Sequence, residues 1–487
     1  METNEALQMT LMQQAEAEVR HLLAGVEHLE VGDLKGVEQQ VLSSMFALGR
    51  KVLEQIMQAQ IAHVPSQARR EGACGHQQRL VSRRPKQVLT LLGPITIQRG
   101  YYQCLHVARE SVDDGEAGCS HGEAPADAVW GIQERRTSAG VQEAVSYLCA
   151  SLTLQEAATT FSRLFPWQMS AREALALMQP VGEALAMLEQ EQVEALWKEA
   201  AEKPSALRGG EEPASGSIKR LYIELDGVMA RLRRGSVPLE PQEQQRGGDV
   251  YREIKVGAVF VGQRGREQSE LVPGVYVDEP QAGSLHYVAQ RTALGDFGRH
   301  LYAVAVQGGL LHASQVVVLG DGARWLWRLV EEHFPGAVQI VDLWHAQQHV
   351  WEVAHAVFGR GTSQGAAWAK QGCHWLVHGQ IEVLVKAITA FPPIAPPAGQ
   401  SKSVPEQAIG YFSSTAERMR YPAFRAQGMQ IGSGIAEAAC KSVVSTRTKR
   451  SGMRWTPQGL DALLPLRTAV LNGSFDAFWQ RRSHALA

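Results

Sequence analysis

Two aspartates stand where a metal-dependent enzyme would place its ligands. Asp321 and Asp342 each directly follow a short apolar run of the kind that forms a strand covered on both faces. Between these runs, residues 323–334 space their apolar side chains as a helix does. Such a strand–helix–strand unit brings both carboxylates to the carboxyl ends of its strands, where open α/β sheets bind ligands. A lone carboxylate there is commonly a turn residue or helix cap, but two in succession point to a site.

Two more carboxylates come from distant parts of the chain. Residues 220–232 alternate as a strand does and carry Asp226, while Glu437 lies on a helix introduced by a Gly-Ser-Gly turn. Further strands are predicted at residues 254–262 and 272–277, with a helix at 294–306. Three antiparallel strands, a helix, a parallel strand, a helix and a further strand is the order of an RNase H-like mixed sheet. In that sheet Asp226 and Asp321 lie on neighbouring central strands, and Glu437 can complete a triad.

Clustered carboxylates of this kind need a cation. Two ionised carboxylates about 4 Å apart repel by roughly 4 kcal/mol at an effective dielectric near 20. Oxygen-only ligands with room for water and phosphate favour Mg²⁺ or Mn²⁺. Two such ions can activate a water or a 3′-hydroxyl and stabilise the leaving oxygen in phosphoryl transfer. The pattern therefore predicts metal-dependent cleavage of phosphodiesters.

Each candidate also has a purely structural interpretation. Asp342 and His345 are either a helix cap and a hydrogen-bonded histidine or groups that support the metal site. Glu437 is either the third acid or a first-turn carboxylate paired with Lys441. Glu417 is the weaker substitute for it.

Cysteine and histidine residues surround a predicted hairpin formed by residues 88–92 and 95–104. Thiolate or imidazole ligands at two knuckles around a hairpin describe a zinc ribbon. The candidate zinc ligands are Cys74, His76, Cys104 and Cys119. The chain has no Cys-x-x-Cys pair, so the alternative is a small basic β-module whose cysteines are merely buried.

A basic run without acidic residues follows Glu437. Its members are Lys441, Arg447, Lys449, Arg450 and Arg454, followed by Trp455. Such cations grip phosphates, and an indole ring can stack on an unpaired base. The run is therefore a candidate DNA-binding segment, with a solvated basic helix as the alternative.

These motifs together resemble a known family. The run GDGARW at residues 320–325, Asp342 with His345, GSGIAEAACK at 432–441 and RTKRSGMRW at 447–455 are similar to DDE transposases of bacterial insertion sequences, in particular the ISKra family. The resemblance covers most of residues 63–470. It implies Asp226, Asp321 and Glu437 as the triad, an Asp-x-x-His element at Asp342 and His345, and a helical insertion. It also implies a cysteine ribbon near the N-terminus, from which this chain departs.

The expected function is that of a DNA transposase. By resemblance, such an enzyme binds terminal inverted repeats, cleaves the DNA with Mg²⁺ or Mn²⁺ and joins the freed 3′-hydroxyl to target DNA. One alternative is a domesticated or inactive transposase that acts as a DNA-binding regulator. Another is an RNase H-like nuclease, which would give no strand-transfer products.

A multidomain α/β organisation follows from the length of 487 residues and the order of the segments. The predicted parts are a helical region at 1–62, a zinc-ribbon-like basic module at 63–128, a helical region with a possible helix-turn-helix at 129–203, a linker at 204–217, the catalytic core at 218–345, a helical insertion at 346–430 and the completion of the core at 431–487. The apolar stripe of residues 1–62 suits packing within the chain or a homo-oligomer contact. Pro180 is expected to kink or split its helix.

Composition sets the class of protein. The net charge is -2, with 45% hydrophobic and 20% charged residues, which is ordinary for a globular protein. No transmembrane run and no secretory signal are expected. Six scattered cysteines suit a reducing cytosol. These features predict a cytoplasmic protein without a membrane partner, and the resemblance to bacterial transposases implies a bacterial, nucleoid-associated one.

Overall fold

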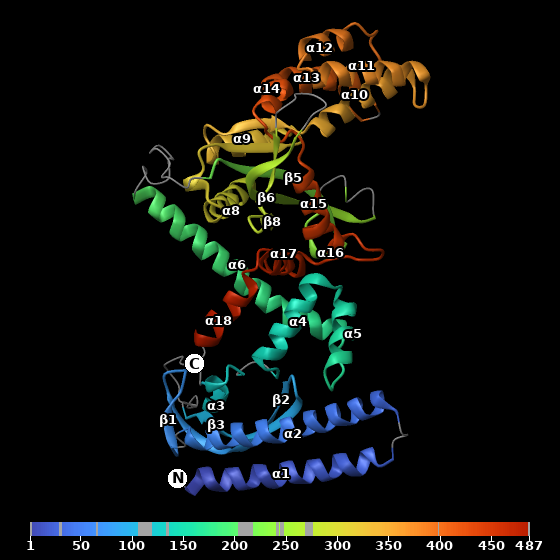
Figure 1. Cartoon of the computed structure of the whole chain (residues 1–487). Helices are drawn as coiled ribbons and strands as arrows, with labels where there is room; N and C mark the ends of the chain where they lie inside the picture. The colour runs from blue at the N-terminus through green and yellow to red at the C-terminus, as the bar shows by residue number, and fades with distance from the viewer. Residues whose placement is uncertain are drawn as a thin grey trace. The chain divides into compact units, whose positions relative to one another are not determined.

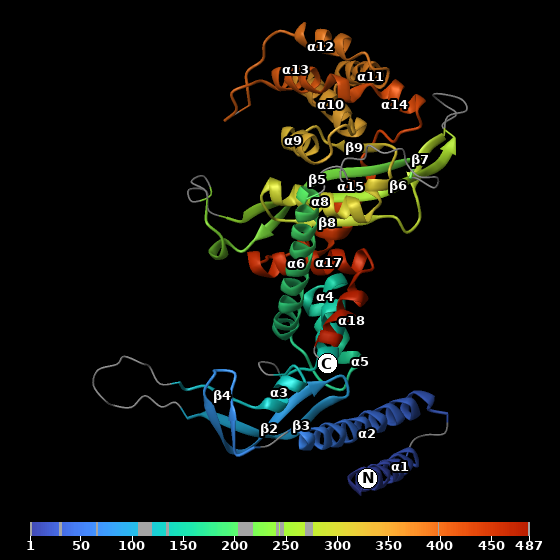
Figure 2. The ribbon, with the colours of Figure 1, turned by 90° about the vertical axis from the view of Figure 1, so that its left-hand side faces the viewer.

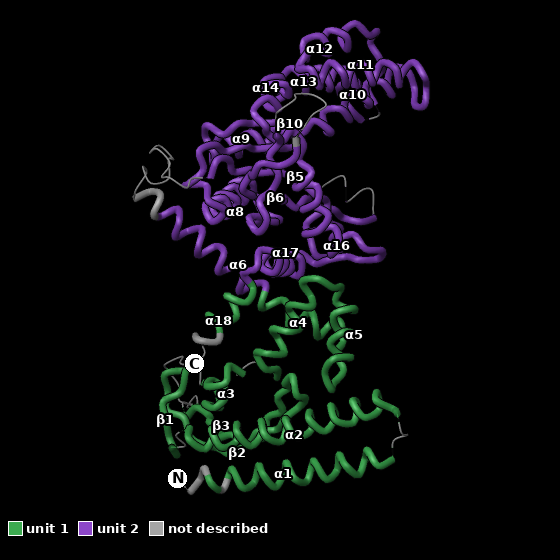
Figure 3. The backbone as a smooth tube through the Cα atoms, viewed as in Figure 1, with its two compact units in different colours: residues 1–181, 475–487 green, residues 182–474 purple. Residues whose placement is uncertain are grey.

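The structure is a computed structural model. It describes residues 2–28, 32–64, 67–105, 119–132, 136–202, 218–239, 243, 248–267, 276–397 and 399–485. The chain forms two compact units, unit 1 with residues 1–181 and 475–487, and unit 2 with residues 182–474 (Figure 3). Helices and two separate sheets make it a mixed α/β protein, as the sequence predicts.

Unit 1 begins with a helical hairpin. Helix α1 spans Glu2–Val26 and packs against α2, Leu34–His63 (Figure 1). The Asp33 side chain caps α2 by accepting a hydrogen bond from the Gly36 amide at 2.9 Å. The predicted helical character of residues 1–62 is therefore confirmed for the described residues.

A four-stranded antiparallel sheet follows, in the order β1-β2-β3-β4. Its strands are β1 Arg69–Glu71, β2 Gln77–Thr90, β3 Gly93–Cys104 and β4 Gly122–Glu123, followed by the short helix α3 Pro125–Val129. The predicted hairpin is present, but β2 starts at Gln77, eleven residues before the expected Val88. This part of the strand has polar and basic side chains in place of alternating apolar ones, so the sequence pattern does not indicate a strand there. The core of the sheet packs Val88, Ile95 and Ile97 against Met57 and Ile61 of α2.

Two helices and the start of a third complete the N-terminal part of unit 1. They are α4 Ala139–Ser151, α5 Leu154–Leu164 and the residues of α6, Ala171–Glu202, up to Val181; the rest of α6 belongs to unit 2. Helix α18 Phe475–Ala485 returns to unit 1 from the C-terminus. Ser138 and Thr153 cap α4 and α5 with their hydroxyl groups. The predicted split at Pro180 is wrong, because α6 runs through it unbroken. Met178 and Val181 are buried on either side of the proline, so packing offsets the lost backbone hydrogen bond.

The sheet of unit 2 has six strands. They are β5 Arg220–Leu232, β6 Val250–Glu267, β7 Tyr276–Pro280, β8 His286–Gln290, β9 Val316–Gly320 and β10 Val338–Val341. The order is β10-β9-β5-β6-β7, and β8 pairs with β6 beside β7. Strands β9 and β10 run parallel to β5, whereas β6 is antiparallel to it. The two central strands that carry the candidate acids are therefore neighbours, and β8 is a strand that the sequence analysis missed.

Helices cover this sheet and extend beyond it. Helices α8 Leu294–Gln307 and α9 Arg324–His333 pack into its core. The single-turn helices η1 Arg234–Ser236 and η2 Leu310–His312 belong to the same unit. A helical group follows, with α10 Leu343–Phe358, α11 Ser363–Val377, α12 Ile381–Thr389, α13 Val404–Thr415, η3 Ala416–Met419 and α14 Tyr421–Ala426. Both ribbon views show this group beyond the strands of the sheet (Figures 1 and 2).

The chain then returns to the sheet. Helix α15 Gly434–Ala439 packs against β5 and β6 and passes into a π-helical turn, η4 Cys440–Ser445. Helices α16 Thr446–Thr448 and α17 Pro457–Leu471 follow. Among the described residues, no helix combines the length and the apolar content that crossing a membrane requires.

Candidate active site and metal centre

Asp226 and Asp321 lie at matching positions along two neighbouring parallel strands. Leu225 of β5 is opposite Gly320 of β9, and the residue that follows each of them is an aspartate. Both side chains are half-buried. Each carboxylate accepts a hydrogen bond from a nearby backbone amide, Asp226 from Gly227 at 2.7 Å and Asp321 from Ala323 at 2.8 Å. The pKa of Asp226 is raised, first by burial and further by the negative charge of Asp321.

Several groups surround this aspartate pair. The Cys440 thiol hydrogen-bonds Asp226, and His345 also lowers the pKa of Asp226 by its charge. The Tyr411 hydroxyl donates to the Asp321 carbonyl oxygen at 3.0 Å. Gly322 has a φ of 95°, and a Cβ atom there would lie 2.6 Å from the Tyr411 ring. A glycine after Asp321 is therefore required by both the backbone conformation and the space.

The Asp342 carboxylate accepts hydrogen bonds from backbone amides at two places. One of its oxygens caps α10 by accepting from the amides of Trp344 at 2.6 Å and His345 at 3.3 Å. The other accepts from the Ser433 amide at 2.8 Å and from the Ser433 hydroxyl. Of the two interpretations of this aspartate, the structure therefore shows the helix cap. The same carboxylate also fastens the turn that precedes α15, and it sets the first turn of α10, which carries the exposed His345.

Glu224 is a second anchor for the same segment, and the sequence analysis did not single it out. It is fully buried on β5, two residues before Asp226 and on the same face of the strand. Its Oε2 atom accepts from the Ala436 amide at 2.8 Å, at the N-terminal end of α15. Burial raises its pKa to about 8, against the lowering effect of the Ala436 and Ile435 amides. The available signal was a carboxylate inside an otherwise apolar strand.

Glu437 is the least engaged member of the predicted triad. Its exposed carboxylate accepts a hydrogen bond from Lys441 at 2.7 Å, as its structural interpretation predicts. Within the part of the chain that the structure describes, it does not join Asp226 and Asp321 in a group whose ligand atoms all lie within 4.8 Å of one another. Cys440 links the two regions, because its pKa is raised by burial, by Asp226 and also by Glu437. Glu417 forms an exposed pair with Arg420 instead.

The basic run after α15 divides into exposed and buried residues. Lys441, Lys449, Arg450 and Arg454 are exposed, although Lys441 pairs with Glu437 and Arg454 lies 3.4 Å from Asp249.

Arg447 and Trp455 are buried in this structure, and their contact with DNA stays a prediction. The Trp455 indole donates to the Arg447 carbonyl oxygen at 3.0 Å, and its backbone bridges the end of β5 at Leu232. The burial of Trp455 therefore goes with its pairing to Leu232, a residue that lies far from the basic run in sequence. Arg447 is buried beside it and accepts the indole hydrogen bond through its carbonyl oxygen.

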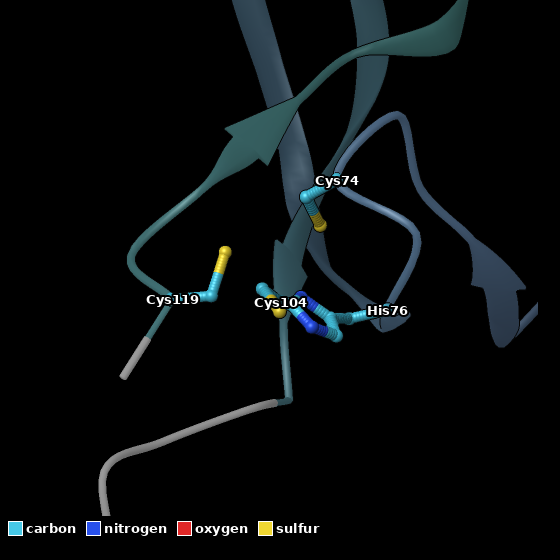
Figure 4. A group of neighbouring side chains, drawn as sticks. All are labelled: Cys74, His76, Cys104 and Cys119. Atoms are coloured by element: carbon cyan, nitrogen blue, oxygen red, sulfur yellow. The ribbon is translucent and has the colours of Figure 1, made fainter. Parts of the chain in front are cut away.

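The candidate zinc ligands come together in unit 1. One ligand atom from each of Cys74, His76, Cys104 and Cys119 lies within 4.8 Å of the others (Figure 4). Cys74 and His76 belong to the turn between β1 and β2, where Gly75 has a φ of 73°. Cys104 ends β3, and its amide bonds the His121 carbonyl oxygen at 2.9 Å, which brings in the segment with Cys119. His121 itself lies 3.4 Å from Glu123.

The chemistry of this cluster suits a metal such as zinc. Three sulfurs and one imidazole are a common donor set for a structural zinc ion. The pKa of the Cys74 thiol is lowered to about 6, chiefly by the hydrogen bond from the His76 backbone amide. Side-chain hydrogen bonds with His76, Cys104 and Cys119 lower it further, while burial opposes them. A thiolate is the form that binds metal, so the cluster is arranged for ligation.

The chain was compared with known protein families, characterised proteins and solved structures. No protein-family model matches the chain, and no characterised protein matches its sequence. Among solved structures, the chain is similar to the Drosophila P element transposase strand transfer complex, with a TM-score of 0.29 and 9% sequence identity over 68% of this chain and 91% of that chain. A TM-score of this size does not establish a shared fold.

Proposed function

We propose that this protein is a DDE-type DNA transposase of a bacterial insertion sequence, of the ISKra family. The observation that carries the proposal is the register of β5 and β9: their pairing ends with Leu225 opposite Gly320, and the next residues are Asp226, inside β5, and Asp321, just after β9. The strand order β7-β6-β5-β9-β10, with the last two strands parallel to β5, supports an RNase H-like core. The helical group after β10 would be the helical insertion of such a transposase.

A cation fits the carboxylate pair. Two half-buried aspartates repel each other, and the raised pKa of Asp226 reflects that repulsion together with burial. Divalent Mg²⁺ or Mn²⁺ held by Asp226, Asp321 and Glu437 would supply an activated water or 3′-hydroxyl and stabilise the leaving oxygen. Glu437 would exchange its exposed pair with Lys441 for this role, since such surface pairs contribute little stability.

The proposed reaction has two steps. First, a water oxygen bonds to phosphorus at the element's end and the bond to the 3′ oxygen breaks, which leaves a free 3′-hydroxyl. Then that 3′ oxygen bonds to a target phosphorus and displaces the target's own 3′ oxygen. His345 and the exposed cations Lys449 and Arg450 would contact the DNA phosphates beside the acids.

The remaining modules fit the same function. The Cys/His cluster would hold a structural zinc ion in a ribbon-like module, and α4 to α6 would form a helix-turn-helix region that binds the terminal repeats. The helical hairpin α1–α2 exposes Met12, Leu23, Leu42 and Met45, which suits association into a homo-oligomer.

The test uses the full chain with duplexes that carry the DNA flanking its coding region. In Mg²⁺ or Mn²⁺ the wild type should cleave at the element's end and join that end to a second duplex. Asp226→Asn, Asp321→Asn and Glu437→Gln should each lower cleavage by at least about a thousandfold, because each removes a metal ligand, and should leave end binding intact.

The matched control is Glu417→Gln, an exposed paired glutamate outside the site, which should retain wild-type cleavage. A triad variant that still cuts would remove that residue from the triad. Cleavage without strand-transfer products would indicate an RNase H-like nuclease. Binding without any cleavage would indicate a DNA-binding regulator.

A further inference from the structure

The β2–β3 hairpin contains a stretch of strand that is exposed on both faces. All seven residues 79–85 of β2 are exposed, which is unusual for a strand in a folded module. The Leu80 amide still bonds the Ala68 carbonyl oxygen, and Leu89 bridges Thr137. Between these points, no other strand of the described residues pairs with the outer edge of β2. The stretch therefore forms one open, exposed edge of the β2–β3 ribbon, whereas the β3 residues paired with it, from Arg99 to Tyr102, are half-buried or buried.

The ribbon is strongly cationic. Described residues 67–105 contain seven Arg and Lys residues and one acidic residue, Glu71. Lys86 and Arg99 are bound by Asp127 at 3.0 and 2.7 Å, and Arg70 lies 3.7 Å from Glu123. The four others have no ion pair with a carboxylate of the described residues. We name this set the ribbon arginines: Arg69, Arg79, Arg83 and Arg84.

Their placement favours an anionic partner. Arg69 and Arg79 are directly opposite each other on β1 and β2, an arrangement of like charges that destabilises a sheet unless an anion lies between them. Arg83 and Arg84 are consecutive, so they point to opposite faces. The Arg84 guanidinium stacks on the Tyr101 ring at 3.8 Å, which holds its charge in place.

We propose that the ribbon arginines bind the phosphates of duplex DNA, with the open edge of β2 against the duplex. Arginine guanidinium groups form paired hydrogen bonds with phosphate oxygens, and such contacts do not depend on the base sequence. The register of β2 with β3 shifts between Leu80 and Ser82, and a bulge of this kind increases the local twist of the exposed edge. The Cys/His cluster ties β3 at Cys104 to the β1–β2 turn and so stiffens the base of the ribbon.

This proposal deepens the proposed function, on which it rests only for the choice of DNA as the partner. Binding can be measured without cleavage, by fluorescence anisotropy of labelled duplexes with the full chain and no added Mg²⁺ or Mn²⁺ and no chelator, so that the Cys/His cluster keeps its metal. Arg79→Gln with Arg83→Gln should weaken binding at least about tenfold at moderate salt and reduce the slope of log Kd against log salt by about 2, because two phosphate contacts are lost.

The matched control carries the same change of charge on the helical hairpin, Arg20→Gln with Lys35→Gln, at two exposed residues, and should bind as the wild type does. Arg79→Lys with Arg83→Lys should keep most of the affinity, which separates charge from folding effects.

Unchanged affinity and salt slope in the Gln double variant would overturn the proposal. The arginines would then serve only to prevent the open edge of β2 from pairing with a strand of another molecule. The same variants should also be measured with single-stranded RNA of the same length. If the Gln double variant lost affinity for this RNA but bound duplex DNA as the wild type does, the proposal would be overturned too. A wild type that binds duplexes through these arginines but never cuts in Mg²⁺ would contradict the proposed catalysis and leave the ribbon interface standing.

Discussion

At the scale of residues, the carboxylates around β5 fall into two kinds. Asp226 and Asp321 lie at matching positions after the last paired residues of β5 and β9, whereas Glu224 and Asp342 are buried and hold the backbone amides of residues 433–436. Asp321 was predictable because it follows a short strand pattern, and Asp226 because it lies inside one. The role of Glu224 depends on a helix that begins more than two hundred residues later, and no local pattern shows such a contact. The burial of Trp455 was not predicted for the same reason, since it comes from the pairing of Trp455 with the end of β5.

Glu224 gives a prediction on stability. Its pKa is raised from 4.5 to about 8, so the folded state binds a proton more tightly than the unfolded state does. The stabilisation is fully present below pH 4.5 and is lost as the pH rises through about 8. Glu224→Gln keeps an acceptor for the Ala436 amide and removes the titration. The variant should therefore gain in Tm relative to the wild type between pH 5 and 9, by about a few °C.

The measurement is thermal unfolding of both proteins at several pH values. Glu417→Gln serves as the control, since its exposed carboxylate should shift the curve little. Parallel wild-type and Glu224→Gln curves across this range would show that the carboxyl group does not change its proton affinity on folding.

At the scale of elements, the boundaries of strands and helices follow the apolar patterns well. Strand β5 and helix α8 begin where the sequence predicts, because both have clear periodicity. Strand β8 is short and was missed, and β2 was shortened because its exposed half carries arginines instead of alternating apolar residues. Helix α6 continues through Pro180 because tertiary packing outweighs the local effect of a proline.

The Cys/His cluster gives the prediction at this scale. The purified protein should contain about one zinc ion per chain, and Cys104→Ser should lose most of it, because three ligands hold zinc far more weakly than four. Elemental analysis by mass spectrometry measures the content. The loss should also make the β2–β3 hairpin more sensitive to proteolysis.

The matched control for this experiment is Cys149→Ser, a buried cysteine of α4 outside the cluster. Its zinc content should equal that of the wild type. A wild type without bound zinc, or a Cys104→Ser protein that keeps its metal, would rule out the zinc centre and leave buried cysteines in a basic module.

At the scale of the whole molecule, the sequence predicts a mixed α/β chain with several parts, and the structure has two compact units with one sheet in each. Sequence order alone places Asp226 and Asp321 on neighbouring strands, because a parallel crossover through α8 leads to β9 beside β5. The position of the Glu437 side chain does not follow from the order of the strands. Its pair with Lys441, four residues further on, is one of the two interpretations that the sequence offers, whereas its place on a short helix before a π-helical turn is shown by no periodicity.

The central claim is that Asp226, Asp321 and Glu437 share divalent cations. The most direct measurement is anomalous X-ray diffraction from crystals of the full chain grown with Mn²⁺ and a duplex that carries the element's end. We expect manganese bound between Asp226 and Asp321, with Glu437 turned away from Lys441 to contact the metal. Crystals with ordered DNA but no manganese at these aspartates, or with Glu437 still paired to Lys441 while the metal is bound, would contradict the account.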